Sequence, residues 1–200
     1  MLDVHQEFFD RLAEEWDLSF TAEDLERLTR VVNRLQITAG FDILDLGCGT
    51  GILFDMLRRK VESKGSVTGV DFSLQMAARA HRNFPFDNVN VVDGDVVALP
   101  FRGGCFDMVI AFSSFPHFSD RQKALVEARR VLKPGAPFHV IHLMSSTEIT
   151  EMHNRVGGAV AHDALPDAGE MTPLLEAAGF VHVKIEDKPG LYLASAINSQ

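Results

Sequence analysis

The sequence is poor in cysteine and in basic residues. Cys48 and Cys105 are its two cysteines, each beside a glycine and without the paired spacing of a disulfide framework or a structural zinc site. A reducing, cytoplasmic environment is therefore expected. Lysine and arginine number 19 against 28 acidic residues, which gives a formal net charge of -9. Because clustered basic residues hold nucleic acids and anionic membranes, neither is an expected partner.

Membrane-spanning and secretory patterns are also missing. No window approaches the roughly twenty apolar residues that cross a bilayer. The N-terminal residues MLDVHQEFFDRLAEEWD are acidic and amphipathic, whereas a secretory leader is basic and then apolar. The chain has 200 residues, of which 46% are hydrophobic, and this is enough for one sizeable core. We therefore expect one domain over residues 1–200, with a small molecule or another protein as partner.

Helical and strand patterns alternate along most of the chain. Residues 3–16 and 21–36 show the helical spacing of apolar residues, and Thr21 with Asp24 supplies a cap and a first-turn acid to the second helix. From residue 41, strands are expected at 41–46, 66–71, 88–95, 106–114 and 136–144, and helices at 52–62, 73–84 and 121–132. This rhythm predicts a parallel sheet with helices on both faces.

The pattern changes after residue 144. A long connection leads to a helix at 170–180, and the run FVHVKIEDKPGLYLASAI predicts two antiparallel strands joined by an Asp-Lys-Pro-Gly turn. The expected fold class is α/β, with a Rossmann-like, mostly parallel sheet of seven strands and a C-terminal antiparallel hairpin. A second copy of the chain could pair with the exposed edge of this hairpin, so a homodimer is one expectation.

The segment DLGCGTG, residues 45–51, lies at the end of the first strand of the expected sheet and opens a helix. Glycines there allow a sharp bend and the close approach of a ligand, and free N–H groups at a helix start favour a negative group. Asp71 ends the next strand, where it can accept hydrogen bonds from ribose hydroxyls. The spacing is Gly-x-Gly-x-Gly, whereas a dinucleotide site has Gly-x-Gly-x-x-Gly. The pattern indicates an adenosine-bearing cofactor.

Five segments, in this order, resemble the class I S-adenosylmethionine-dependent methyltransferases of the small-molecule type. They are ILDLGCGTGIL, VTGVDFSLQMAARA, NVVDGDVVALPF, FDMVIAFSSFPHFSD and RVLKPGAPF, and the resemblance covers most of the chain. It implies a methyltransferase whose donor is S-adenosylmethionine and whose product is S-adenosylhomocysteine.

The resemblance also implies which residues hold the donor. Gly47 and Gly49 would line its methionine part, with Asp45 near the amino group. Asp71 would hold the ribose hydroxyls, and Asp95 would accept a hydrogen bond from the adenine amino group. The other implied contacts are Phe72 and Leu74 beside the ribose or adenine, the backbone of Val96 at the ring, and Ala111, Phe112 and Ser113 beside the methionine part. The alternative for Asp71 and Asp95 is that each only caps the turn after its strand.

Residues 1–36 are similar to the helical lid that many small-molecule methyltransferases lay over the donor. Phe8, Phe9 and Trp16 are the candidate contacts, and the alternative is an aromatic stripe that packs on the core. A lid would exclude water from the transfer site. In this family the reaction is a direct displacement, so alignment of donor and acceptor is the main task. A base is needed only when the nucleophile starts out protonated.

Candidate acceptor residues lie in two segments. SSFPHFSD offers Phe115, His117 and Phe118, with His117 either a base or a residue that only shapes the pocket. The Asn-Pro-Pro-Tyr signature of many nucleic-acid methyltransferases is absent. In HVIHLMSSTEITEMH, strand alternation sends His139 and His142 to opposite faces. We expect His139 to be packed and hydrogen bonded, and His142 to lie near the ligand-binding edge of the sheet.

The insertion after this strand supports three interpretations. In the first, His142 and His153, with Glu148, form an acceptor pocket in which an imidazole takes a proton from a hydroxyl, thiol or acid. In the second, the same two histidines and either His162 or Asp163 bind a metal or a metal-containing acceptor. In the third, these are surface and capping residues.

The expected protein is a methyltransferase with a lid at 1–36, an acceptor-side insertion at 144–167, and three catalytic candidates, His142, His153 and His117. It moves a methyl group from S-adenosylmethionine to a small-molecule acceptor by direct displacement, and no metal ligand is assigned. One alternative is a metal-binding methyltransferase that acts on a metal-containing or metalloid acceptor. The other is a non-catalytic module that binds S-adenosylmethionine and engages a partner protein.

Overall fold

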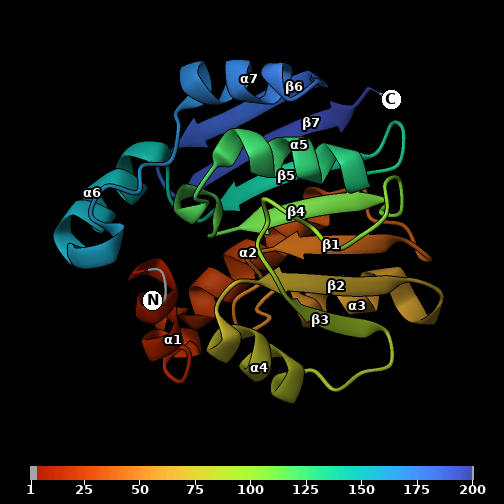
Figure 1. Ribbon diagram of the computed structural model, residues 1–200, viewed down its shortest axis with the longest axis horizontal. Helices are drawn as coiled ribbons and strands as arrows, with labels where there is room; N and C mark the ends of the chain where they lie inside the picture. The colour runs from red at the N-terminus through yellow and green to blue at the C-terminus, as the bar shows by residue number, and fades with distance from the viewer. Residues whose placement is uncertain (1–3, 200) are drawn as a thin grey trace.

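A seven-stranded sheet forms the centre of the computed structural model, which describes residues 4–199 (Figure 1). The strand order is β3-β2-β1-β4-β5-β7-β6. The strands are β1 Asp42–Leu46, β2 Ser66–Asp71, β3 Val89–Asp93, β4 Met108–Phe112, β5 Pro137–His142, β6 Phe180–Lys188 and β7 Leu191–Asn198. β1 to β5 run parallel, and β7 pairs antiparallel with both β5 and β6. The predicted fold class and the C-terminal hairpin are confirmed.

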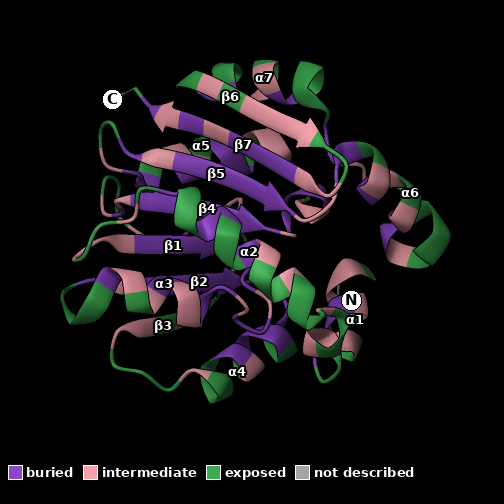
Figure 2. Ribbon diagram, turned by 180° about the vertical axis from the view of Figure 1, so that it is seen from behind, coloured by how far each residue is buried: buried purple, intermediate pink, exposed green. Residues whose placement is uncertain are grey.

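Helices cover both faces of the sheet (Figures 1 and 2). One face carries α2 (Ala22–Arg34) and α3 (Phe54–Val61), and the other carries α5 (Arg121–Val131) and α7 (Ala168–Ala177). The other helices are α1 (Val4–Leu12), α4 (Leu74–Asn83), α6 (Ser146–Val156) and the short 3-10 turns η1 Trp16–Ser19, η2 Glu62–Lys64, η3 Phe115–His117 and η4 Gly158–Val160. Within residues 4–199, none of the helices is long and apolar enough to cross a membrane.

Two large hydrophobic clusters fill the space on the two sides of the sheet. Ile43 belongs to the cluster beneath α2 and α3, and its neighbour Leu44 belongs to the cluster beneath α5 and α7. This split follows from the alternation of side chains along a strand. β1 and β4 are buried on both faces, which explains their continuous apolar sequences, whereas the edge strands β3 and β6 are more exposed (Figure 2).

Side-chain caps fix where several helices begin. The capping box of Thr21 and Asp24 at α2 confirms the predicted cap. A second capping box, Ser145 with Glu148, starts α6 within the long connection that follows residue 144. The sequence analysis gives no bounds for this helix, although the Ser-x-x-Glu spacing is a signal for its start. α7 begins at Ala168, ahead of the predicted residue 170, because Asp167 caps it.

The predicted helix at residues 3–16 is also wrong in length. Residue 3 lies outside the described residues, and α1 ends at Leu12. The chain then turns and continues as η1, which brings Trp16 close to the glycine loop. The side chain of Asp17 accepts a hydrogen bond from Thr50 Oγ1 in that loop. These long-range contacts outweigh the local helical preference of the segment.

The carboxyl ends of the parallel strands point towards one edge of the sheet, and both α1 and α6 lie beyond this edge (Figure 1). Therefore α1 and η1 of the predicted lid and α6 of the predicted insertion approach the place where ligands bind in doubly wound sheets, whereas α2 packs on a face of the sheet (Figure 1). The division of the chain into one domain with these two additions stays a prediction.

Candidate active site

A cavity of about 980 Å³ opens at the carboxyl ends of β1, β2 and β4. Its walls come from α1 and η1 on one side and from the loops that follow these strands on the other. The glycine loop and three carboxylates, Asp71, Asp93 and Asp95, line one end. His5, His117 and Arg121 line the other end with Asp163, so the two ends differ in chemistry.

The glycine loop lets the backbone approach its neighbours closely. Gly47 has a φ of 67°, in the left-handed region that favours glycine, and a Cβ added there would lie 2.5 Å from Ser114 Cβ. The Ser114 hydroxyl donates to the Leu46 carbonyl at 2.6 Å, which fixes the loop after β4 against the end of β1. Ser113, between this loop and β4, also has a positive φ of 52° and lines the cavity. The floor of the cavity is thus held in one conformation.

Asp71 connects the glycine loop to the end of β2. Its carboxylate accepts hydrogen bonds from Gly49 N at 2.7 Å and from Ser73 N at 2.9 Å. Burial raises the pKa of Asp71 to about 6, although these two hydrogen bonds act in the opposite direction. Asp71 therefore caps the turn after its strand, as the alternative proposes. It also lines the cavity, and each carboxylate oxygen has a second lone pair for a ligand hydroxyl.

Asp45 lies beneath the loop and does not line the cavity. It is buried, and its Oδ1 has no hydrogen-bond partner among the described residues. Burial, together with repulsion from Asp71, raises the pKa of Asp45 to about 8. A buried carboxyl without a partner is costly, and a nearby cationic group would stabilise its charged form. Asp45 and the acidic end of the cavity therefore fit a ligand that carries positive charge.

The other implied donor residues divide into two groups. Gly47, Gly49, Phe72, Asp95, Val96, Phe112 and Ser113 line the cavity. Ala111 is fully buried in β4 and Leu74 is 48% exposed on α4, and neither lines the cavity. Asp95 Oδ1 accepts a hydrogen bond from Val97 N at 3.1 Å, so this residue also stabilises its own turn. The structure thus brings most of the implied set together around one space.

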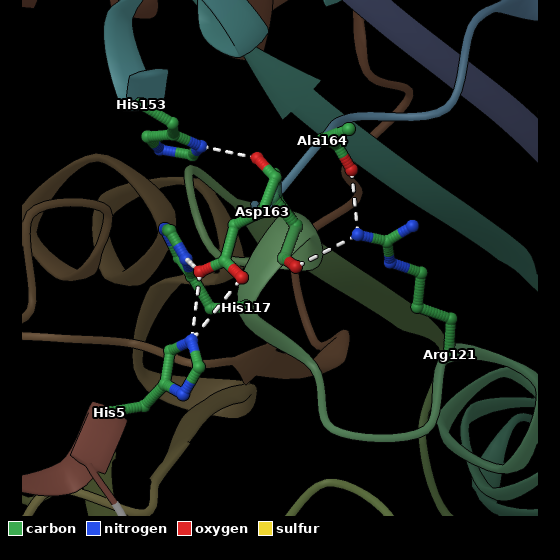
Figure 3. Close-up of polar contacts among 7 residues, drawn as sticks. His5, His117, Arg121, His153, Asp163 and Ala164 are labelled. Carbon is green, nitrogen blue, oxygen red and sulfur yellow. Dashed lines mark hydrogen bonds and ion pairs between the residues drawn. The ribbon is translucent and has the colours of Figure 1, made fainter. Parts of the chain in front are cut away.

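The other end of the cavity is organised by Asp163. Its Oδ2 lies 2.6 Å from His117 Nδ1 and 3.0 Å from His5 Nε2, as Figure 3 shows. Burial raises the pKa of Asp163, but the hydrogen bond and charge of His117, with those of His5, outweigh burial and leave the pKa below its usual value. Because an ionised carboxylate only accepts hydrogen bonds, both imidazoles donate to it.

His117 is neutral in this arrangement. Burial lowers its pKa, and the hydrogen bond from Nδ1 to Asp163 only partly opposes this effect. Since Nδ1 carries the proton, Nε2 keeps a lone pair, and no described residue hydrogen-bonds to Nε2. Phe9 packs edge-on against the ring at a centroid distance of 5.0 Å. His117 is therefore an oriented imidazole with a free basic nitrogen in the wall of the cavity.

Three comparisons with known proteins agree with this geometry. Residues 43–135 match the family model described as "Methyltransferase domain". A demethylmenaquinone methyltransferase from Lactococcus lactis subsp. lactis is 30% identical over 95% of this chain and 87% of that protein. The chain belongs to the class I S-adenosylmethionine-dependent methyltransferases. The predicted family and the predicted enzyme class are confirmed, and the members of this family use S-adenosylmethionine as methyl donor.

Other relatives of this methyltransferase align over less of their length. The demethylmenaquinone methyltransferase of Thermus thermophilus is 38% identical over 66% of this chain and 63% of that protein. Among solved structures, a chain from the complex between the Haloferax volcanii Trm112 methyltransferase activator and a methyltransferase superposes with a TM-score of 0.82 at 20% identity. That match covers 96% of this chain and 98% of the other, and it supports the fold.

His142 occupies a different place from the one predicted for it. It ends β5 near the expected edge, but its side chain is 1% exposed and it does not line the cavity. Neither ring nitrogen has a hydrogen-bond partner within residues 4–199. Burial, with smaller contributions from His117 and His153, lowers the pKa of His142 to about 3. The ring packs edge-on against Tyr192 at 6.3 Å and is a neutral, enclosed imidazole.

His153 and Glu148 support the site from outside the cavity. His153 is buried, and its Nδ1 donates to the backbone carbonyl of Asp163. Its ring lies 4.9 Å from that of His117. Glu148 Oε2 accepts from Ser145 N and from Gly190 N, each at 2.8 Å, and so joins α6 to the turn of the hairpin. The acceptor pocket of His142, His153 and Glu148 in the first interpretation is not formed as predicted.

The remaining predictions have varied outcomes. His139 is buried and hydrogen bonded to Ser195 at 2.9 Å, as predicted. Of the other aromatic candidates, Phe9, Trp16 and Phe118 line the cavity, Phe8 packs against the small hydrophobic cluster around Phe9, and Phe115 lies in the core. His162 is exposed. No group of three or more side chains with metal-ligand geometry occurs within residues 4–199, so the described structure offers no support for the metal interpretation.

His5 is the site residue that the sequence analysis misses. It lies on α1, far in sequence from its partner Asp163, and no spacing rule connects the two. Asp163 appears in the sequence analysis only as a metal ligand. An acidic residue inside a long insertion at the ligand-binding edge was the one available signal.

Proposed function

We propose that this methyltransferase moves the methyl group of S-adenosylmethionine to a small molecule whose nucleophile carries a dissociable proton, with His117 as general base. One observation carries the proposal. His117 lines the same cavity as the glycine loop, with Nδ1 held by Asp163 at 2.6 Å and Nε2 without a hydrogen-bond partner among residues 4–199. An orienting carboxylate behind an imidazole is the arrangement that prepares histidine for proton transfer.

The donor end of the cavity would hold S-adenosylmethionine by complementary charge and by hydrogen bonds. When bound, this molecule supplies a methyl group on a positively charged sulfur, which leaves as a neutral thioether. Asp71 would accept hydrogen bonds from the ribose hydroxyls, Asp95 would face the adenine, and Asp45 would stabilise the cationic amino group. Gly47, whose backbone packs against Ser114 too closely for a Cβ, would line the methionine part together with Ser113.

The acceptor end would align the nucleophile and take its proton. Because burial lowers the pKa of His117, its Nε2 stays unprotonated at neutral pH and can accept a proton from a hydroxyl or thiol. Asp163 would hold the ring in the required tautomer and stabilise the imidazolium that forms. His153 and His142 act indirectly in this scheme, since one anchors the backbone of Asp163 and the other is enclosed in the core.

Aromatic rings from the lid and the sheet edge favour a planar acceptor. Phe9, Trp16 and Phe20 come from the first twenty residues and face Phe72 and Phe112, with centroid distances of 5.8 to 6.4 Å between successive rings of this wall. Rings arranged in this way bind flat apolar molecules through area and edge contacts. The relatives are named for demethylmenaquinone, a quinone, which is consistent with a cyclic acceptor.

The test is the formation of S-adenosylhomocysteine from S-adenosylmethionine in the presence of defined acceptors. A suitable panel contains catechol, a naphthol, thiophenol and reduced demethylmenaquinone, with aniline and imidazole as nitrogen nucleophiles that need no base of this kind. We expect product with at least one hydroxyl or thiol compound. Tight donor binding with no product above the protein-only background would instead support a binding module. Turnover confined to the nitrogen compounds would contradict the role of His117.

A further inference from the structure

The carboxylate of Asp163 is the point at which the N-terminal helix meets the base. His117 Nδ1 and His5 Nε2 both donate to Oδ2, at 2.6 Å and 3.0 Å, and His5 Nε2 is also 3.3 Å from Oδ1 (Figure 3). The side chain of Asp163 is 14% exposed and that of His117 is 10% exposed. One partly buried carboxylate is therefore shared by an imidazole in the cavity wall and an imidazole on α1.

The loop that carries Asp163 is joined to the rest of the protein by hydrogen bonds that do not involve α1. His153 Nδ1 donates to the carbonyl of Asp163, and Arg121 Nη2 donates to the carbonyls of Ala164 at 2.7 Å and Pro116 at 3.0 Å. Tyr192 Oη donates to the carbonyl of Pro166 at 2.9 Å. Because Arg121 joins the Asp163 loop to the turn that carries His117, these two residues keep their relative positions when α1 moves.

α1 is attached more lightly. It packs through a small hydrophobic cluster, separate from the two large ones, in which Phe9 meets Met76 and Val160. Gln6 Nε2 donates to the carbonyl of Phe72 at 2.9 Å, and Asp10 accepts from the Ser73 hydroxyl at 2.6 Å. Because His5, Gln6 and Phe9 of α1 line the cavity, a movement of α1 would open this wall. Elements with few core contacts are those that open most easily.

We propose that His5 is a positioning residue that links closure of α1 over the donor to the orientation of the His117 base, through Asp163. The inference rests on the proposed function. With α1 closed, the hydrogen bond from His5 fixes the rotation of the Asp163 carboxylate. Its Oδ2 then faces His117 Nδ1, and the Nε2 of His117 points to the acceptor. With α1 open, the carboxylate loses one of its two donors and the ring loses its contact with Phe9. The base is then properly aligned only in the closed, water-excluding state.

The charged and titratable groups around His117 determine the expected direction of change. Asp163 raises the proton affinity of the ring, whereas His5 on α1 and His153 on α6 lower it. Arg121 on α5 lies on the far side of the same loop, and the enclosed His142 on β5 is neutral. When the His5 side chain is removed, the negative charge of Asp163 interacts with His117 alone, and water can reach the ring of His117. Both changes raise the pKa of His117.

The experiment is ¹⁵N NMR of the histidine rings in the full-length protein with S-adenosylhomocysteine bound. In the wild type we expect His117 as the Nδ1–H tautomer. In His5→Ala its titration midpoint should rise by about half a pH unit or more, and the tautomers should mix. His5→Gln, which keeps a donor at the position of Nε2, should restore the wild-type behaviour. His81→Ala, on the exposed face of α4, is the matched control and should change nothing.

An unchanged midpoint and tautomer of His117 in His5→Ala would overturn the inference, and so would failure of His5→Gln to restore them. The proposed function fails by other observations, namely absence of donor binding or full transfer activity in His117→Gln. Donor binding can be followed separately through Trp16, the single tryptophan, which lines the cavity. A shifted titration midpoint of His117 in His5→Ala, with intact donor binding, supports the coupling between α1 and His117 whatever the acceptor is.

Discussion

The two ends of the cavity are built in opposite ways. The proposed donor end comes from neighbouring strand ends, where the glycine loop and Asp71 lie within a short stretch of chain. The acceptor end comes from separated segments, because His5, His117, Arg121 and Asp163 meet only in the folded protein (Figure 3). The donor end is therefore a local consequence of the fold, whereas the acceptor end depends on how the lid and the insertion pack.

Burial also has opposite effects on the two ends. Burial raises the pKa of Asp45 to about 8 and of Asp71 to about 6, so at neutral pH Asp45 tends to keep its proton while Asp71 is mostly ionised. At the acceptor end it lowers the pKa of His117, so this ring tends to lose one. Without ligands the site is thus less charged than its residue types suggest. A cationic donor would restore the carboxylates and leave the basic imidazole for the acceptor.

The largest effect is expected from removal of the base. His117→Gln should lower the rate of transfer to a hydroxyl acceptor on the order of 10²- to 10⁴-fold, because general base catalysis contributes this much. Donor affinity should stay within about twofold, since His117 is at the other end of the cavity. Stopped-flow transfer rates and calorimetric titration with S-adenosylhomocysteine measure the two quantities. A parallel loss of both would show that the two ends are not separable.

The next effect concerns the donor alone. Asp71→Ala should weaken donor binding by about 1–3 kcal/mol through the loss of charge-assisted hydrogen bonds, and it also leaves Gly49 N and Ser73 N without their acceptor. The exposed Asp87→Ala is the control and should bind as the wild type does. Unchanged calorimetric affinity of Asp71→Ala would remove the ribose assignment.

The sequence was sufficient to predict that Gly47, Gly49 and Asp71 come together at one edge of the sheet, because the signals for this are local. The alternation of strands and helices predicts the sheet, and Gly47, Gly49 and Asp71 follow from a motif at fixed places on that sheet. The same reasoning failed for His142, since nearness to the carboxyl edge does not say whether a side chain points into the cavity or into the core. It missed His5 because a contact between residues 5 and 163 depends on packing, and no periodic pattern records it.

His142 provides a smaller test of the acceptor end. His142→Leu should stabilise the protein by about 1 kcal/mol, because it replaces a buried imidazole without hydrogen bonds by an apolar side chain of similar size. The melting temperature should rise by roughly 2–4 °C. His139→Leu, which breaks the bond to Ser195, should instead destabilise. A fall in stability together with lost transfer in His142→Leu would return His142 to the catalytic set.

The same imidazoles make stability depend on pH. The folded-state pKa of His142 is about 3 and that of His139 about 4, both below the unfolded value near 6.5. The unfolded chain therefore binds more protons between these values, and the free energy of unfolding should decrease as the pH falls from 6.5 towards 3 because folding must deprotonate both rings. Urea unfolding at a series of pH values measures this loss, and His142→Leu should make it smaller.

The smallest effect is the release of protons when the donor binds. At pH 7 Asp45 is mostly protonated, since its pKa is about 8, and a cationic donor group beside it would lower that pKa. Binding should then release up to about one proton, and affinity should increase as the pH rises towards 8. The number of protons released can be calculated from the difference between the binding enthalpies measured by calorimetry in phosphate and in Tris. Asp45→Asn should abolish the contribution of Asp45 to this proton release. Equal binding enthalpies of the wild type in the two buffers would argue against a donor cation at Asp45.

The pH profile of methyl transfer at saturating donor tests the central claim most directly, which is that a neutral His117 held by Asp163 deprotonates the acceptor. For the wild type we predict a rate that falls on the acid side, with a midpoint below the ordinary histidine value near 6.5, because burial lowers the pKa of His117. In His117→Gln this acid limb should disappear. The same acid limb in both proteins would contradict the assignment of His117 as the base.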